Sequence, residues 1–187
     1  MIYSHRFPRL RQSAQAVVLS LACFLGTATL VGAEISRFVG DYAGSALVEQ
    51  ANGAAFSRDM SVSITTTREG FSVRWSSTTY RDDGRTKEKS YVIDFVPSDR
   101  DDVFAAAMKR NVFGHAVQLD PMKGEPYVWS RINGDTLTVY SLFVSADGGY
   151  ELQQFDRTLA EGGLQLDFKR TDNGVPKRSV STFLKRQ

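Results

Sequence analysis

The side chains of residues 58–66 alternate between apolar and polar types, and the same period of two recurs at residues 71–76 and 91–95. Alternation of this kind is typical of a β-strand that has one face against a core and the other in water. A first strand is expected at residues 40–48, ahead of these three segments. The first half of the chain therefore predicts four strands of an antiparallel sheet.

The C-terminal third of the chain consists of short apolar-rich segments separated by tight turns. The turns contain Asn, Asp and Gly, which tolerate the positive φ angles that hairpin turns between twisted strands require. These turns are Asn133-Gly134-Asp135, Asp147-Gly148-Gly149, Glu161-Gly162-Gly163 and Asp172-Asn173-Gly174. Turn signals repeated at this spacing predict a five-stranded meander, with strands at residues 127–132, 136–144, 150–159, 164–170 and 179–185.

Two segments do not follow the simple pattern. After Pro97, Ser98 is followed by acidic residues that favour a helix N-terminus, and apolar residues at helical spacing predict one short helix over residues 99–111. In residues 150–159 the apolar parity changes at Gln153-Gln154. Either a β-bulge at the glutamines returns the apolar residues to one face, or Gln154 and Asp156 line a wet lumen; the pattern leaves both open.

The first 33 residues have the layout of a secretory signal peptide. Three arginines precede a mostly apolar stretch, which ends at the small-residue site Val31-Gly32-Ala33. The alternatives are an uncleaved membrane anchor and a lipoprotein attached through Cys23, the single cysteine of the chain. Cleavage near Ala33-Glu34 is the favoured interpretation, and it predicts a periplasmic or secreted protein whose residues 34–187 form one domain without disulfides.

About eight to nine strands and one short helix can form either a closed up-and-down barrel or a two-sheet sandwich. Consecutive hairpins favour the meander barrel, which also removes exposed sheet edges. The opening Gly40-Asp41-Tyr42, the meander and the expected export together resemble the calycin superfamily of lipocalin-like barrels. Lipocalins carry Trp where this chain has Tyr42, and they pair it with a basic residue late in the barrel. By this resemblance, the partner here would be Arg157 or Arg178.

The sequence contains few groups suited to catalysis. Without the N-terminal segment, His115 is the single histidine, and no G-x-S-x-G motif, zinc-ligand cluster or phosphate-binding loop is present. His115 is interpreted as a surface or satisfied loop histidine. No cofactor or metal is expected, and an enzyme is the least favoured function.

Aromatic side chains on the predicted strands are the main candidates for a ligand site. If Tyr127, Trp129 and Arg131 share an inner face, they would suit a ligand with an apolar body and an anionic head. The alternative is that these aromatics only fill the core. The full set of candidate ligand-binding residues is Trp75, Tyr91, Tyr127, Trp129, Arg131 and Tyr140. Basic residues near the C-terminus, including Arg170 and Arg178, are interpreted mainly as a solvated face rather than as a site for an anionic partner.

The favoured hypothesis is an exported lipocalin-like protein that binds a small, largely apolar or amphiphilic molecule. The alternative is an envelope interaction or inhibitor module with a solid-packed barrel and a protein partner. The near-balanced charge that remains without the N-terminal arginines gives no sign of a nucleic-acid partner, and no second apolar run is long enough to span a membrane as a helix. The two hypotheses differ in whether the barrel contains a cavity.

Overall fold

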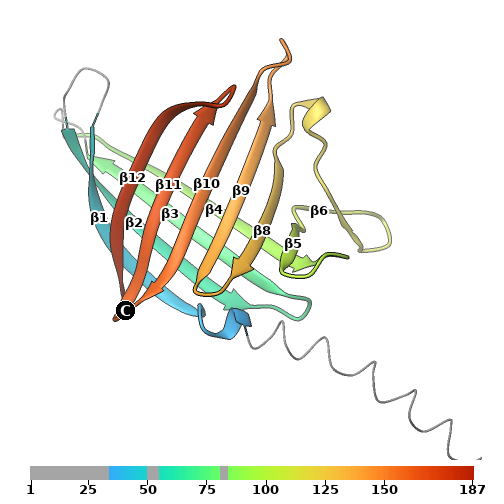
Figure 1. The fold of residues 1–187 in the computed structure, drawn as a ribbon, viewed down its shortest axis with the longest axis horizontal. Helices are drawn as coiled ribbons and strands as arrows, with labels where there is room; N and C mark the ends of the chain where they lie inside the picture. Colours follow the sequence, from blue (N-terminus) through green and yellow to red (C-terminus); the bar gives the residue numbers. More distant parts are fainter. Residues whose placement is uncertain (1–33, 50–54, 81–83) are drawn as a thin grey trace, which may run out of the picture.

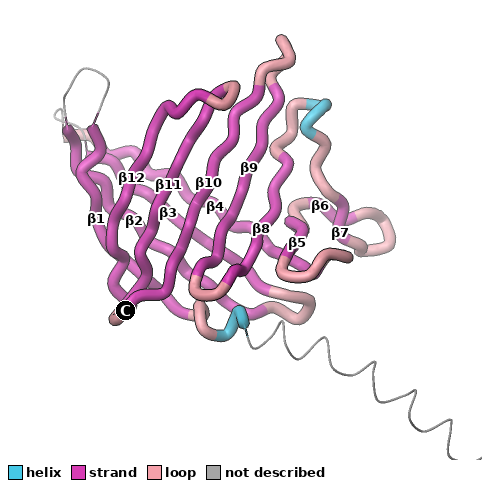
Figure 2. Tube along the Cα trace, viewed as in Figure 1, coloured by secondary structure: helices cyan, strands magenta, loops and turns pink. Residues whose placement is uncertain are grey.

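The structure is a computed structural model that describes residues 34–49, 55–80 and 84–187. The predicted signal peptide at residues 1–33 lies outside the described residues, as do Asp82 and Asp83 between the third and fourth predicted strands. Strands make up most of the described chain (Figure 2). None of its helices is long and apolar enough to cross a membrane.

Ten antiparallel strands close into one barrel (Figure 1). Each strand pairs with the next along the chain, and β12 returns to β1 through the pair Tyr42 and Arg186. The barrel strands are β1 (Gly40–Glu49), β2 (Ala55–Thr66), β3 (Phe71–Tyr80), β4 (Thr86–Pro97), β5 (Val103–Ala106), β8 (Tyr127–Asn133), β9 (Thr136–Val144), β10 (Tyr150–Ala160), β11 (Gly163–Asp172) and β12 (Val175–Arg186). The prediction of a mainly β, up-and-down meander barrel is confirmed, with slightly more strands than expected.

A small excursion separates β5 from β8. It contains the hairpin of β6 (Lys109–Arg110) and β7 (Ala116–Val117), followed by the 3₁₀ helix η1 (Pro121–Lys123). This excursion projects from one side of the barrel in Figure 1, next to β5 and β8.

The prediction of a helix over residues 99–111 is wrong, because this segment contributes β5 and β6. Ser98 closes a tight turn instead of capping a helix: its hydroxyl accepts from the Arg100 amide at 3.2 Å and donates to the Val103 carbonyl at 2.8 Å. Asp102 has a φ of 60°, which is outside the right-handed helical region. Phe104 then enters the barrel core opposite Ser130 of β8. This extra strand explains the higher strand count.

The hydrophobic core fills one end of the barrel, which we call the closed end. Ile35 and Phe38, just before β1, are buried there, and the Tyr42 hydroxyl donates to the Phe38 carbonyl at 2.8 Å. Inward side chains at this end are completely or almost completely buried: Ile64, Phe71, Val73, Phe95, Phe104, Leu137, Leu164 and Leu184. The closed end therefore carries most of the packing that stabilises the fold.

Tyr42 has a basic partner, but it is neither of the two arginines that the lipocalin resemblance suggested. The guanidinium carbon of Arg186, on the last strand, lies 5.6 Å from the Tyr42 ring centroid. Arg186 also donates to the Val39 carbonyl. Arg157 lies deeper in the barrel, and Arg178 lies toward its opposite end, so the geometry selects Arg186.

Strand β10 runs without a bulge, and its inner face is the one that carries Phe155, Arg157 and Leu159. Its pairing with β9 and β11 is continuous, and the register shift in this region falls in the β11–β12 pair instead, between Arg170 and Thr171. Gln154 and Asp156 therefore face outward, so neither of the two interpretations of the glutamines is correct. The predicted turns are confirmed where they are described; for example, Asn173 and Gly174 have φ angles of 47° and 77°, as a type I′ hairpin turn requires.

Candidate ligand-binding cavity

The end of the barrel opposite the closed end, which we call the open end, contains a cavity of about 830 Å³. This volume is within the range of small-molecule sites in proteins. Its walls are formed mainly by inward side chains of β3, β4, β8, β9 and β10. The principal apolar lining residues are Trp75, Tyr91, Ile93, Val128, Val139, Phe143 and Phe155. Ser141, Glu151 and Gln153 add polar groups to the same wall.

Aromatic contacts mark the floor of this cavity, above the closed-end core. The Trp75 ring stacks on Tyr91 with centroids 5.3 Å apart, and it lies 5.6 Å from the Phe155 ring. Phe155 in turn packs on Phe168 at 4.7 Å. Tyr91 lies opposite Trp75 on the inner face and keeps 48% of its surface exposed, where it lines the cavity. The stacked aromatic rings therefore extend from the core into the cavity.

A second, smaller cavity of about 210 Å³ adjoins the first and shares Trp75, Tyr91, Gln153 and Phe155 with it. It extends toward β2, β11 and β12. Five basic residues line it: Arg58, Lys89, Arg157, Arg170 and Arg178. Among the described residues, no Asp or Glu lines it. We call this smaller cavity the basic lobe.

Arg157 is the most deeply buried member of the basic lobe, with 1% of its surface exposed. Its Nε and Nη1 atoms are buried without a hydrogen-bond partner in the described structure. Its guanidinium carbon lies 5.6 Å from the ring centroids of both Trp75 and Phe155, a cation–π arrangement. Burial lowers the pKa of Arg157 to about 10, partly opposed by the negative charge of Asp156, so the guanidinium remains charged at neutral pH.

The other arginines of the lobe are held by only a few polar contacts. Arg58 donates from Nε to the Thr79 hydroxyl at 3.1 Å, and its pKa is lowered by burial and by the positive charge of Arg178. Arg170 forms an ion pair with Glu151, while its Nε is buried without a partner. The lobe is therefore a region of concentrated, incompletely neutralised positive charge.

The six candidate residues separate into two groups. Trp75 and Tyr91 line both cavities. The expectation that Tyr127, Trp129 and Arg131 line the lumen is wrong. These three residues do share a face with Tyr140, but it is the outer face of the barrel.

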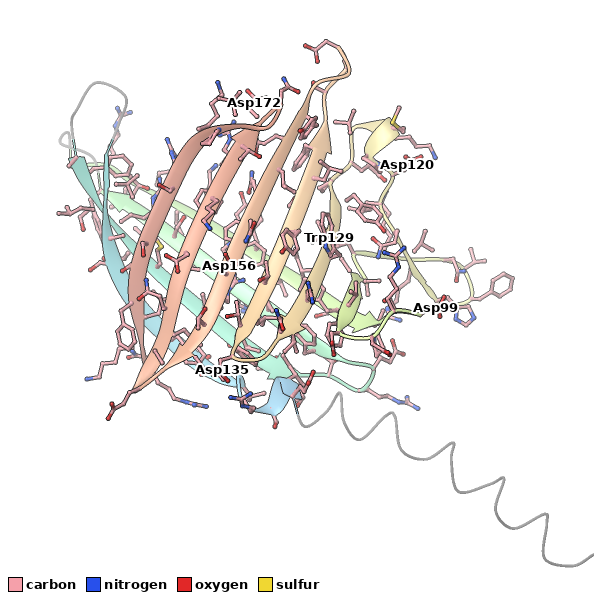
Figure 3. The ribbon with its side chains drawn as sticks, in the orientation of Figure 1. Asp99, Asp120, Trp129, Asp135, Asp156 and Asp172 are labelled. Atoms are coloured by element: carbon pink, nitrogen blue, oxygen red, sulfur yellow. The ribbon has the colours of Figure 1, made fainter. Side chains whose placement is uncertain are left out.

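The pairing of β8 with its neighbours explains this placement. Ser130 lies opposite Phe104 of β5 and Val139 of β9, which turns Val128, Ser130 and Ile132 inward. The outer aromatics instead contact one another: Trp129, which is labelled in Figure 3, stacks on Tyr140 with ring centroids 4.8 Å apart.

The basic residues of the lobe were not among the candidates, although the sequence carries a signal for them. Arg58 has the same parity as the apolar residues Met60 and Val62 on β2, and Arg157 has the same parity as Phe155 and Leu159 on β10. An arginine in phase with an apolar stripe is an inward charge. Arg170 and Arg178, interpreted from the sequence as solvent-facing, likewise line the interior.

The remaining chemical candidates are not gathered into a site. His115 is exposed in the loop between β6 and β7, where its amide donates to the Asn111 side chain. In the described part of the chain, no group of three or more His, Cys, Asp or Glu residues is placed to hold a metal ion. No protein-family model and no curated protein matches this chain.

Proposed function

We propose that this protein binds a small, largely apolar or amphiphilic molecule inside its barrel. The observation that carries the proposal is the contrast between the two ends of one lumen. The closed end is packed solid, whereas the open end keeps a cavity of about 830 Å³ lined by Trp75, Tyr91 and Phe155. A barrel that served only as a rigid scaffold for protein contacts would gain stability by filling this space, so the cavity counts against the solid interaction module.

The architecture supports a lipocalin-like, calycin assignment as part of the proposal. A ten-stranded meander, the Gly40-x-Tyr42 opening and the stacking of Arg186 on Tyr42 are in keeping with it. We further propose that the protein is exported after cleavage near Ala33-Glu34. Mass spectrometry of the mature protein should then find Glu34 at the N-terminus; an intact N-terminus or a lipid on Cys23 would contradict export by this route.

Tryptophan fluorescence can test ligand binding directly. The chain has two tryptophans, and Trp129 lies on the outer face, so the Trp129→Phe variant leaves Trp75 in the cavity as the single reporter. Titration with a long-chain alcohol such as dodecanol should change the Trp75 emission saturably.

A matched pair of variants distinguishes the cavity from the outer surface. Ser141 lines the cavity and Leu142 is its outward neighbour on β9. Ser141→Phe should fill the cavity and weaken binding at least about tenfold, the effect of roughly 1.4 kcal/mol, while Leu142→Phe should leave the affinity unchanged. An absent signal with long-chain alcohols, acids and phosphates, or equal effects of the two variants, would refute the proposal.

A further inference from the structure

Charge is distributed unevenly along the interior of the barrel. The larger cavity has the carboxylates of Asp147, Glu151 and Asp172 near its rim. The basic lobe, by contrast, is lined by four arginines and Lys89 and by no described carboxylate. Placing charges of one sign together costs free energy, since like charges repel in a low-dielectric interior. Folding alone therefore gives no explanation for the basic lobe.

The strand pairing itself forces some of these charges together. Arg170 and Arg178 lie directly opposite one another in the β11–β12 pair, an arrangement that destabilises a sheet when the charges are alike. Arg178 also lowers the pKa of Arg58 across the lobe. Among the described residues of the lobe, only Arg170 has a carboxylate partner, Glu151. The other three arginines have no described carboxylate within ion-pair distance.

The surroundings of Arg157 indicate where an anion would bind in the basic lobe. Its neighbour Asp156 faces the outside of the barrel, where it accepts a hydrogen bond from Thr138 at 2.7 Å and one from Gln154. Asp156 therefore cannot supply a hydrogen-bond acceptor to Nε and Nη1 inside the lobe. A buried guanidinium with unsatisfied donors is costly, and an anion entering the lobe would supply the acceptors that these donors lack.

We propose that the basic lobe binds the head group of an anionic amphiphile, and that the head group carries phosphate-type rather than single-carboxylate chemistry. This inference rests on the proposed function, because the apolar part of the same molecule would occupy the larger cavity. A carboxylate brings one negative charge and two oxygens. A phosphate monoester brings close to two charges and three strong acceptor oxygens, which suits guanidinium groups that reach the lobe from β2, β10 and β12.

Three ligands of equal chain length test the preference in the Trp129→Phe protein: dodecyl phosphate, dodecanoate and dodecanol. Dodecyl phosphate should bind at least about tenfold more tightly than dodecanol, the scale of one hydrogen bond to a charged group, with dodecanoate between them. Raising the salt concentration should weaken the phosphate and leave the alcohol unchanged. Inorganic phosphate alone should bind far more weakly than dodecyl phosphate, because it lacks the apolar chain.

Variants then locate the site. Arg157→Met should reduce the preference for dodecyl phosphate over dodecanol to less than about threefold while leaving the dodecanol affinity within about twofold. Arg178→Gln, at a more exposed position, should reduce the same preference less and provides an independent variant if Arg157→Met does not fold. Arg131→Gln on the outer face is the matched control and should change neither affinity.

The outcomes separate this inference from the proposed function. Equal affinity for all three amphiphiles, or a phosphate preference that survives Arg157→Met and Arg178→Gln, would overturn the head-group site and leave the binding function intact. Inorganic phosphate binding as tightly as dodecyl phosphate would show a plain anion site, which overturns the amphiphile head-group site, while the proposed function would still stand or fall with the binding of dodecanol. Tighter binding of dodecanoate than of dodecyl phosphate would overturn the phosphate-type assignment.

Discussion

Replacing Arg157 by methionine should make the ligand-free protein more stable. Burial lowers the pKa of this arginine from its ordinary value to about 10, and a drop of this size corresponds to roughly 3 kcal/mol spent on keeping the charge inside the barrel. The cation–π contacts with Trp75 and Phe155 return about 0.5–1 kcal/mol each. Methionine has a similar length, fills irregular space and carries no charge, so the net gain should be about 1–2 kcal/mol.

Urea denaturation of the ligand-free protein measures this directly, through a higher midpoint with an unchanged slope. Arg131→Met, at an exposed position on the outer face, is the control and should shift the free energy of unfolding by less than about 0.5 kcal/mol. If Arg157→Met instead destabilised the protein by more than about 1 kcal/mol, the guanidinium would have to be held by favourable contacts, and the reasoning from its unpaired donors would fail.

The pH dependence gives a second check on the same cause. Because the folded-state pKa lies below the unfolded value, Arg157 is protonated in both states below pH 10, and the full cost of burial applies there. Above pH 10 the folded protein releases this proton more readily than the unfolded chain does, so the cost declines. The stability difference between Arg157→Met and wild type should therefore be constant from about pH 6 to 9 and should narrow above pH 10.

Further predictions concern the closed end and its turns. Phe71→Ala should cost about 3–5 kcal/mol of unfolding free energy. Trp75→Ala, at the partly buried edge of the core, should cost only about 1–3 kcal/mol. Urea titrations of the two variants measure both losses, and a larger loss at Trp75 than at Phe71 would contradict the cavity beside Trp75. Gly163→Ala would press its Cβ against the Leu184 carbonyl and should cost about 2 kcal/mol or more. Gly162→Ala meets open space and should cost about 1 kcal/mol, the penalty of its positive φ; the reverse order of melting temperatures would show that the β11–β12 approach is looser than described.

The meander could be predicted from the sequence because the information that specifies it is local. Residues 58–66 and 71–76 alternate cleanly, since each of these strands has one face on the core and one in water. The Asn173-Gly174 turn could likewise be predicted, because both residue types tolerate the positive φ angles that the turn requires. Closure of the barrel followed from a chain of such hairpins, each joining neighbours in sequence.

The segment that became β5 could not be assigned locally. The apolar residues of this segment have a helical spacing: Val103, Phe104, Ala107 and Met108. The strand that forms instead has only four residues, which is too short to show a clear alternation in the sequence. What decides the outcome is a long-range contact, the docking of Phe104 opposite Ser130 on β8. Tertiary pairing of this kind overrides a weak local preference.

The face of β8 shows a different limit of sequence analysis. Both of its faces are apolar, with Val128 and Ile132 on one and Tyr127 and Trp129 on the other. A period of two separates the faces but does not say which one is inside. Aromatic size suggested the wrong choice, because the narrow space beside Phe104 accommodates aliphatic side chains and leaves the larger rings to stack outside.

The same strands form both the packed core and the cavity that we propose binds a ligand, at different positions along their length. On β10 the inner face passes from Leu159 and the buried Arg157 through Phe155 to Gln153 and Glu151 at the open end. The buried core at the closed end is apolar and does not include the arginines of the basic lobe, so the fold can tolerate the repulsion between those arginines. A buried charge that is expected to lower stability is more easily explained by binding than by folding, and this is why the proposed head-group site rests on Arg157 rather than on the aromatic floor.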